Sequence, residues 1–114
     1  MKNLITILLV FFLAFNANAQ ETKKNKSAKI EFQVSGNCEM CKKRIQKASM
    51  SVSGVKSADW NIDSGLLSLI INENKTSSAT IQKAIAKIGH DNDGQKADEQ
   101  AYNNLHTCCQ YERK

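Results

Sequence analysis

The sequence predicts an α+β fold whose elements follow the order strand, helix, strand, strand, helix, with a weaker candidate for a last strand. Two periodicities support this prediction. Apolar residues alternate with polar ones over 28–34, as in a half-buried strand, and recur every three or four positions over 38–51, as on one face of a helix. A turn at 63–65 separates two further apolar runs, as in a hairpin. The chain has 114 residues, which fits one small domain.

The first strand is expected over 28–34, and a loop at 35–37 leads into a helix over about 38–51. Four residues of this helix fall on a single inward stripe: Cys41, Ile45, Ala48 and Val52. Cys41 therefore belongs to the buried row, whereas Cys38 lies in the preceding loop and should carry the more exposed sulfur. Gly54 is expected to follow the end of this helix.

The second half of the domain begins with strands over 55–62 and 66–71, which should pair as a hairpin. A second amphipathic helix is marked by Ile81, Ala84, Ile85 and Ile88, and Gly89 is well placed to end it. Residues 90–95 have poor strand propensity, so a fourth strand there should be short and at a sheet edge. A brief helix is expected over 97–105. The predicted core consists of Ile30, Phe32, Ile45, Leu67, Leu69, Ile81, Ile85 and Ile88.

The N-terminal 19 residues have the composition of a secretory signal peptide. Lys2 supplies the positive start, residues 4–15 form an apolar run, and 17–19 offer small residues for cleavage before Gln20. The apolar run is shorter than the roughly 20 residues of a spanning helix, so no stable membrane insertion is expected after cleavage. Export to the periplasm follows, with a flexible lead over 20–27, a domain over 28–95 and a C-terminal extension over 96–114.

The formal charge of the whole chain is +5, which mildly favours acidic partners. Nucleic acid is not an expected partner, because no basic stripe interleaved with aromatic residues accompanies this charge. The sequence shows no catalytic triad, phosphate-binding loop or pair of carboxylates, so it does not predict an enzyme. It also contains no proline, which counts against a thioredoxin-type oxidoreductase.

Cys38 and Cys41 form a C-x-x-C at the start of the predicted helix and are the main candidates for chemistry. Free N–H groups at a helix N-terminus stabilise thiolate over thiol, and the basic run 42–44 adds positive charge nearby. Thiolates bind soft metals or attack disulfides. In an exported protein a structural disulfide is a third use, so the spacing alone leaves metal, redox and structural readings open.

The element order and three sequence features resemble the heavy-metal-associated domain family. These features are V-S-G-N-C-E-M-C at 34–41, the Gly-Val pair at 54–55 and Ile-Gly-His at 88–90. The resemblance implies a ferredoxin-like βαββαβ sandwich, with four antiparallel strands and two helices on one face. It also implies that Cys38 and Cys41 bind one soft cation, with Cu(I) favoured and Hg(II) or Zn(II) as alternatives. The partner would then be a metal-transporting ATPase or another metal-binding protein.

Two further features bear on the site that this resemblance implies. The family commonly has methionine where this chain has Gly36, which predicts a looser loop. His90 follows the second helix, beside the C-x-x-C in this fold, and is either an additional ligand or an exposed residue without a role. Met40 is expected to face solvent.

The adjacent Cys108 and Cys109 lie outside the common domain. A vicinal disulfide, an added metal ligand and a bridge to Cys38 are all open for this pair, since neighbouring side chains usually point in different directions. A short helix over 97–105 would bring the pair back toward Cys38. Two functions follow: transfer of a soft metal, or thiol–disulfide exchange in which Cys38 attacks, Cys41 resolves and the tail pair shuttles electrons.

Overall fold

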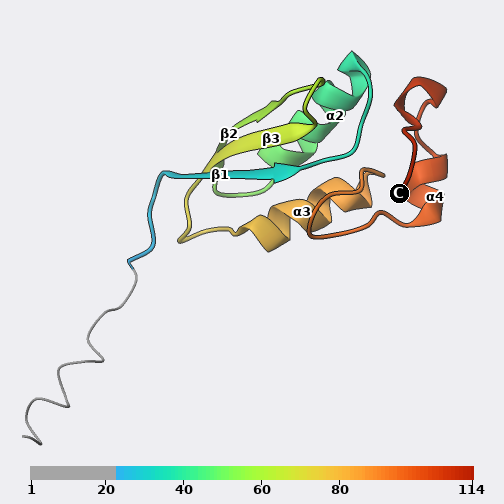
Figure 1. Cartoon of the computed structure of the whole chain (residues 1–114). Helices are drawn as coiled ribbons and strands as arrows, with labels where there is room; N and C mark the ends of the chain where they lie inside the picture. The colour runs from blue at the N-terminus through green and yellow to red at the C-terminus, as the bar shows by residue number, and fades with distance from the viewer. Residues whose placement is uncertain (1–22) are drawn as a thin grey trace, which may run out of the picture.

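The computed structural model describes residues 23–114, which form a three-stranded antiparallel sheet with helices packed on it (Figure 1). The strands are β1 (Ala28–Gln33), β2 (Val55–Trp60) and β3 (Leu66–Ile71), in the spatial order β1-β3-β2. The predicted signal peptide lies outside the described residues. None of the helices within 23–114 is both long and apolar enough to cross a membrane.

Strand pairing places the apolar side chains of the sheet on one face. Phe32 of β1 lies opposite Leu67 of β3, and Ala58 of β2 lies opposite Leu69. The other face of β3 carries Ile70, which is exposed, so this face is not covered. The predicted hairpin of β2 and β3 is confirmed.

Two helices lie over the apolar face of the sheet: α2 (Glu39–Met50) and α3 (Ser78–Lys87). Ile45 of α2 and Ile81 and Ile85 of α3 are fully buried in the same core, as the apolar stripes predicted. Gly89 follows α3 with φ of +106°, a conformation that favours glycine at a helix end. The architecture is the predicted ferredoxin-like sandwich.

The core contains most of the predicted residues and also several large residues that the prediction omitted, among them Trp60 and Tyr111. Ile30 and Ile88 are only partly buried, while the other six predicted residues are buried. Trp60 is fully buried, and its Nε1–H lies 3.1 Å from the carbonyl oxygens of both Val34 and Gly65. This ring therefore connects the end of β1 to the turn between β2 and β3.

The fourth strand of the predicted sheet is reduced to a single bridge between Val34 and Asn92. The side chain of Asn92 explains this difference. Its Oδ1 accepts hydrogen bonds from the N–H groups of Gly94 and Gln95, at 3.2 and 3.1 Å. Such local bonds favour a turn over an extended strand, so the sheet has three strands where the family resemblance implied four.

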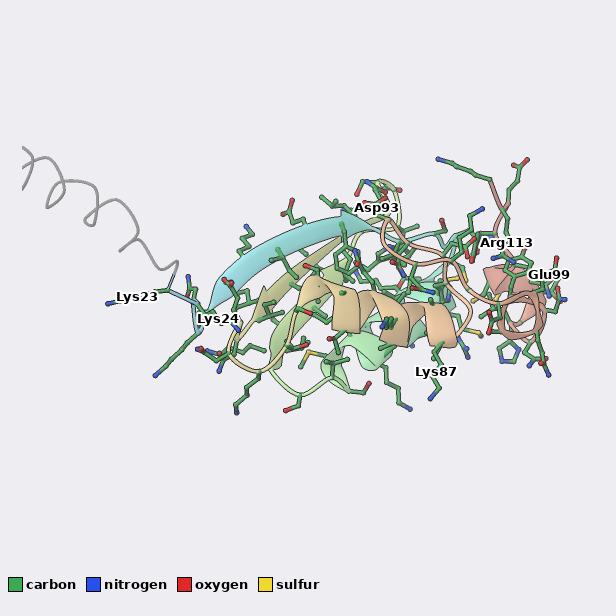
Figure 2. The ribbon with its side chains drawn as sticks, turned by 90° about the horizontal axis from the view of Figure 1, so that it is seen from below. Lys23, Lys24, Lys87, Asp93, Glu99 and Arg113 are labelled. Atoms are coloured by element: carbon green, nitrogen blue, oxygen red, sulfur yellow. The ribbon has the colours of Figure 1, made fainter. Side chains whose placement is uncertain are left out.

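The C-terminal extension contains α4 (Glu99–Asn103) and a short 3-10 helix, η2 (Thr107–Cys109). A helix within 97–105 is thus confirmed, although it is shorter than predicted. The extension lies at the end of the domain where α2 begins (Figure 1). Lys23 and Lys24 lie at the opposite end from Glu99 and Arg113 (Figure 2). The fold therefore returns the tail to the C-x-x-C loop.

Candidate metal centre

Cys38 and Cys41 lie together at the N-terminus of α2. Cys38 is the N-cap residue, and its sulfur accepts a hydrogen bond from the backbone N–H of Cys41 at 3.4 Å. The two sulfurs are 3.0 Å apart. Cys41 is fully buried, whereas Cys38 is partly exposed. The relative exposure of the two cysteines is as predicted.

The structure brings both tail cysteines to the same place. The sulfur of Cys109 lies 3.2 Å from that of Cys38, and the sulfur of Cys108 lies 3.8 Å from it. Cys108 and Cys109 are themselves 4.0 Å apart through sulfur. All four cysteines are free thiols, with Cys109 buried and Cys108 exposed. Cys38 is thus the centre of a four-sulfur cluster.

Tyr111 anchors the tail beside this cluster. Its hydroxyl donates to the carbonyl oxygen of Gly89 and accepts from the backbone N–H of Asp91, both at 2.8 Å. The side chain is buried, and this burial raises its pKa to about 12. The hydroxyl of Tyr102 donates in turn to the carbonyl oxygen of Tyr111. The Tyr111 hydroxyl therefore joins the tail to the loop after α3, and Tyr102 of α4 holds the backbone of Tyr111.

An ion pair between Arg113 and Asp91 adds a second anchor. The guanidinium contacts both carboxylate oxygens, at 2.9 and 2.8 Å, and also donates to the carbonyl oxygen of Ala97 at 2.7 Å. Burial alone would raise the pKa of Asp91, but the hydrogen bonds from Arg113 and from the N–H of Ala97 outweigh it and lower the pKa. Such a bidentate pair fixes orientation as well as charge.

The loop before Cys38 is tightly packed, so the expectation of a looser loop is wrong. A Cβ atom on Gly36 would lie 3.0 Å from the ring of Trp60 and 3.1 Å from Cβ of Cys41. Trp60 fills the space beneath the loop, so a side chain at Gly36 would require Trp60 or Cys41 to shift. Asn37 also holds the loop, because its Oδ1 accepts from the Cys41 thiol at 3.4 Å.

The cysteines differ in how readily they form thiolates. Burial would raise the pKa of Cys38, but hydrogen bonds from the thiol and the N–H of Cys41, followed by Cys109 and Cys108, lower it to about 7. Burial is the main cause that raises the pKa of both Cys41 and Cys109. In the metal-free protein Cys38 is therefore the most readily ionised of these three sulfurs.

His90 is fully buried, so the alternative of an exposed residue is wrong. Its Nδ1 lies 2.7 Å from the carbonyl oxygen of Ser35, which requires the proton on Nδ1, and its ring stacks on Tyr111. Burial lowers the pKa of this ring and keeps it neutral. His90 thus contacts the backbone of the loop, and it is not among the residues grouped around Cys38.

Met40 is 42 % exposed, as predicted, and its sulfur lies 4.0 Å from that of Cys108. It is a neighbour of the tail pair at the surface.

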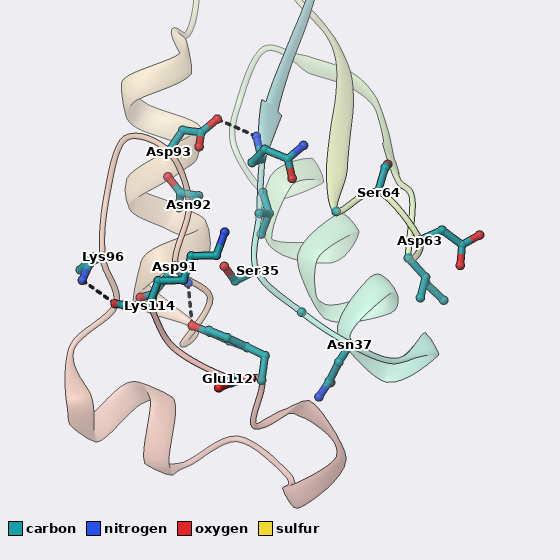
Figure 3. Close-up of a pocket in the computed structure, with 16 residues that line it drawn as sticks. Ser35, Asn37, Asp63, Ser64, Asp91, Asn92, Asp93, Lys96, Glu112 and Lys114 are labelled. Atoms are coloured by element: carbon teal, nitrogen blue, oxygen red, sulfur yellow. Dashed lines mark hydrogen bonds between the residues drawn. The ribbon is translucent and has the colours of Figure 1, made fainter.

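A groove of about 550 Å³ lies between the loop that precedes Cys38 and the C-terminal tail (Figure 3). Its walls come from the loop residues 35–37, the turn 63–65 and the tail residues 111–112 and 114. Figure 3 shows Asn37, Asp63, Ser64 and Glu112 around this groove. The surface next to the candidate site is therefore polar and of mixed charge.

The tail anchors were not predicted from the sequence, because periodicity gives no information on a tail that has no repeating apolar pattern. Trp60 is the single tryptophan of the chain, but its position beneath the loop depends on strand pairing, which the composition does not give.

The family model of the heavy-metal-associated domain matches residues 24–91, which is more than half of the chain. The chain belongs to the heavy-metal-associated domain family. The matched region contains Cys38 and Cys41 but ends before α4, so Cys108 and Cys109 lie outside it.

Solved structures of heavy-metal-associated domains and their relatives share the fold. The CopZ metallochaperone is 29% identical, with a TM-score of 0.56, and the match covers 57% of this chain and 98% of CopZ. The Cu(I)-loaded N-terminal domain of a potential copper-translocating P-type ATPase from Bacillus subtilis is 27% identical, with a TM-score of 0.55 and coverages of 58% and 84%. Oxidized MerP from Ralstonia metallidurans CH34 is 25% identical, with a TM-score of 0.55 and coverages of 58% and 93%. Comparison with curated protein sequences found no significant match.

Proposed function

We propose that this heavy-metal-associated domain binds one soft metal cation through Cys38 and Cys41 and transfers it to another protein in the periplasm. The observation that carries the proposal is the pair of sulfurs 3.0 Å apart at the N-terminus of α2, one buried and one partly exposed. The helix N-terminus favours the negative charge of bound thiolates. Export is supported by the signal-peptide composition of residues 1–19.

The choice of cation follows from the ligands. Thiolate sulfur is a soft ligand that prefers Cu(I), Hg(II) and Zn(II) over Ca(II) or Mg(II). Cu(I) is favoured, because similar structures include CopZ and a Cu(I)-loaded ATPase domain. Hg(II) and Zn(II) are the alternatives. A pKa of about 7 gives Cys38 a large thiolate fraction at neutral pH, so little free energy is spent on its deprotonation.

Transfer requires that a second protein reach the cation. Because Cys38 is partly exposed, an incoming thiolate can contact a cation held there while Cys41 still binds it from below. The proposed partner is a metal-transporting ATPase or another metal-binding protein, since domains of copper ATPases share this fold. The cation leaves chemically unchanged, so the proposed role is transport and not catalysis.

Replacement of both Cys38 and Cys41 by serine tests the proposal. The reduced double variant should lose the high-affinity site for Cu(I), measured by competition with a Cu(I) chelator and by non-denaturing mass spectrometry. Met40→Leu is the matched control, because Met40 lies between the two cysteines but points outward, and it should keep the site. The assignment is wrong if the double variant binds Cu(I) as tightly as the unchanged chain.

Thiol–disulfide exchange is the second candidate, and the 3.0 and 3.2 Å sulfur contacts of Cys38 favour it. The Cys38 thiolate would attack a partner disulfide, form a mixed disulfide and release one partner thiolate. Cys41 would then attack Cys38, release the second partner thiolate and leave an oxidised pair, so that two electrons pass to the partner. Reduction of a model disulfide by the metal-free protein, at a rate abolished by bound Cu(I), would favour this candidate.

A further inference from the structure

We propose that Cys108 and Cys109 join Cys38 and Cys41 in a single four-thiolate centre, which takes a divalent cation that accepts four sulfurs, such as Zn(II) or Cd(II). This inference rests on the proposed function of the C-x-x-C loop and extends it to a part of the chain outside the matched domain. Two thiolates are enough for a two-coordinate cation, whereas structural four-sulfur sites are typical of Zn(II).

Four of the six distances between the sulfurs lie between 3.0 and 4.0 Å, near the spacing of a tetrahedral site. A metal–sulfur bond of about 2.3 Å places the sulfurs of a tetrahedron about 3.8 Å apart. The contacts of Cys38 with Cys41, Cys109 and Cys108 are 3.0, 3.2 and 3.8 Å, and the tail sulfurs are 4.0 Å apart. The sulfurs of Cys38, Cys108 and Cys109 all lie within 4.8 Å of one another, whereas Cys41 lies outside this group and joins it through its 3.0 Å contact with Cys38. Binding of a cation by all four sulfurs requires the two shortest contacts to lengthen and the Cys41 side chain to move toward the other three sulfurs.

The local backbone explains how two adjacent cysteines can serve one cation. Neighbouring side chains of an extended chain point in opposite directions. Here the pair lies in η2, where the N–H of Cys109 donates to the carbonyl oxygen of His106 at 2.8 Å. The next N–H, of Gln110, donates to Thr107 at 3.2 Å. This tight turn brings both sulfurs within 4 Å of Cys38.

The tail is held in this position by contacts that do not involve sulfur. Tyr111, two residues after Cys109, is bonded through its hydroxyl to Gly89 and Asp91, and Arg113 forms the bidentate pair with Asp91. These anchors fix Cys109 in a buried position next to Cys38. The third and fourth sulfurs are thus placed before any cation arrives, which lowers the entropic cost of binding.

Titration with Cd(II) tests the centre, because the thiolate-to-Cd(II) charge-transfer absorbance grows with each Cd–S bond. The reduced full chain should show an absorbance per bound Cd(II) that corresponds to four bonds. Cys108→Ser and Cys109→Ser should each show three, and the variant with both changes should show two, with an affinity at least tenfold weaker. Far-ultraviolet circular dichroism checks that each variant is folded.

The possible results separate this inference from the proposed function. If the unchanged chain shows three bonds or fewer, or if loss of both tail cysteines leaves the absorbance unchanged, the four-thiolate centre is wrong and the C-x-x-C site stands. If Cys38→Ser/Cys41→Ser keeps the full affinity for both Cu(I) and Cd(II), the proposed function itself is wrong.

A second measurement needs no substitution. Cys108 is exposed in the metal-free protein, so a small alkylating reagent should modify it readily. Saturation with Cd(II) should slow this modification at least tenfold, as followed by mass spectrometry of the peptide that contains Cys108. An alkylation rate of Cys108 that is the same with and without Cd(II) would exclude this sulfur from the centre.

Discussion

Substitution of Tyr111 by phenylalanine should release the tail while it leaves the domain folded. The hydroxyl makes two buried hydrogen bonds of 2.8 Å, one to the carbonyl oxygen of Gly89 and one from the N–H of Asp91. Each such bond contributes about 0.5–1.5 kcal/mol, and the buried groups that lose their partner add a desolvation cost of about 1–3 kcal/mol. Together these predict that tail attachment weakens by about 2–6 kcal/mol.

This loss can be measured at Cys109. The side chain is fully buried, so a thiol reagent reaches it only when the tail detaches. When detachment and reattachment are fast, the labelling rate is proportional to the detached population. Because 1.4 kcal/mol is a factor of ten, the labelling of Cys109 should become roughly 30- to 20,000-fold faster in Tyr111→Phe.

Tyr102→Phe is the matched control. Its hydroxyl makes one hydrogen bond, to the carbonyl oxygen of Tyr111, from a side chain that is only partly buried. Loss of a single bond of about 0.5–1.5 kcal/mol predicts an increase of roughly 2- to 12-fold. Hydrogen exchange at the amide of Ile45 should stay unchanged in both variants, which confirms local opening. A Tyr111→Phe rate within threefold of the unchanged chain would refute the anchor.

Three further predictions concern the core, the reactive thiol and the ion pair. Ile85→Ala should lower the free energy of unfolding by about 2–5 kcal/mol in urea denaturation, since Ile85 is fully buried; a loss below about 1 kcal/mol would contradict its place in the core. In the metal-free reduced protein, alkylation of Cys38 should reach half its maximal rate near pH 7, and a midpoint near the ordinary value of about 8.5 would contradict the lowered pKa. The pKa of Asp91 is lower in the folded protein, so its contribution to stability is complete above the unfolded value of about 3.9 and is lost as the pH falls through the folded value. The urea midpoint should therefore fall more steeply below pH 4 in the unchanged chain than in Arg113→Met, and parallel curves would argue against the pair.

The strands and helices that carry a repeating apolar pattern were predictable from the sequence, because burial of one face produces that pattern. The alternation of apolar and polar residues over 28–34 follows from burial of one face of β1. The apolar stripe through Cys41 and Ile45 follows likewise from burial of one face of α2. The prediction of a fourth strand was wrong because the Asn92 side chain accepts hydrogen bonds from nearby N–H groups and stabilises a turn. Such competition between side chain and backbone is local and is not visible in a hydrophobic pattern.

The candidate site was predictable in part for a similar reason. The C-x-x-C and its placement at a helix start follow from spacing, and the structure confirms that Cys38 and Cys41 lie at the start of α2. A substitution such as Gly36 for methionine can be interpreted only with knowledge of what replaces the missing side chain, here the ring of Trp60 from another strand. The burial of His90 likewise depends on Tyr111, which lies 21 positions later in the chain and stacks on its ring.

Because the tail is covalently attached to the domain, its cysteines have an advantage over free thiols in contacting Cys38. Groups joined to a site by a short stretch of chain meet it at an effective concentration on the order of millimolar or more. Free thiols at lower concentrations therefore compete poorly with Cys108 and Cys109 for the position next to Cys38. A protein partner must instead detach the tail or bind beside it, and the strength of the Tyr111 and Arg113 anchors then sets how readily the loop opens to that partner.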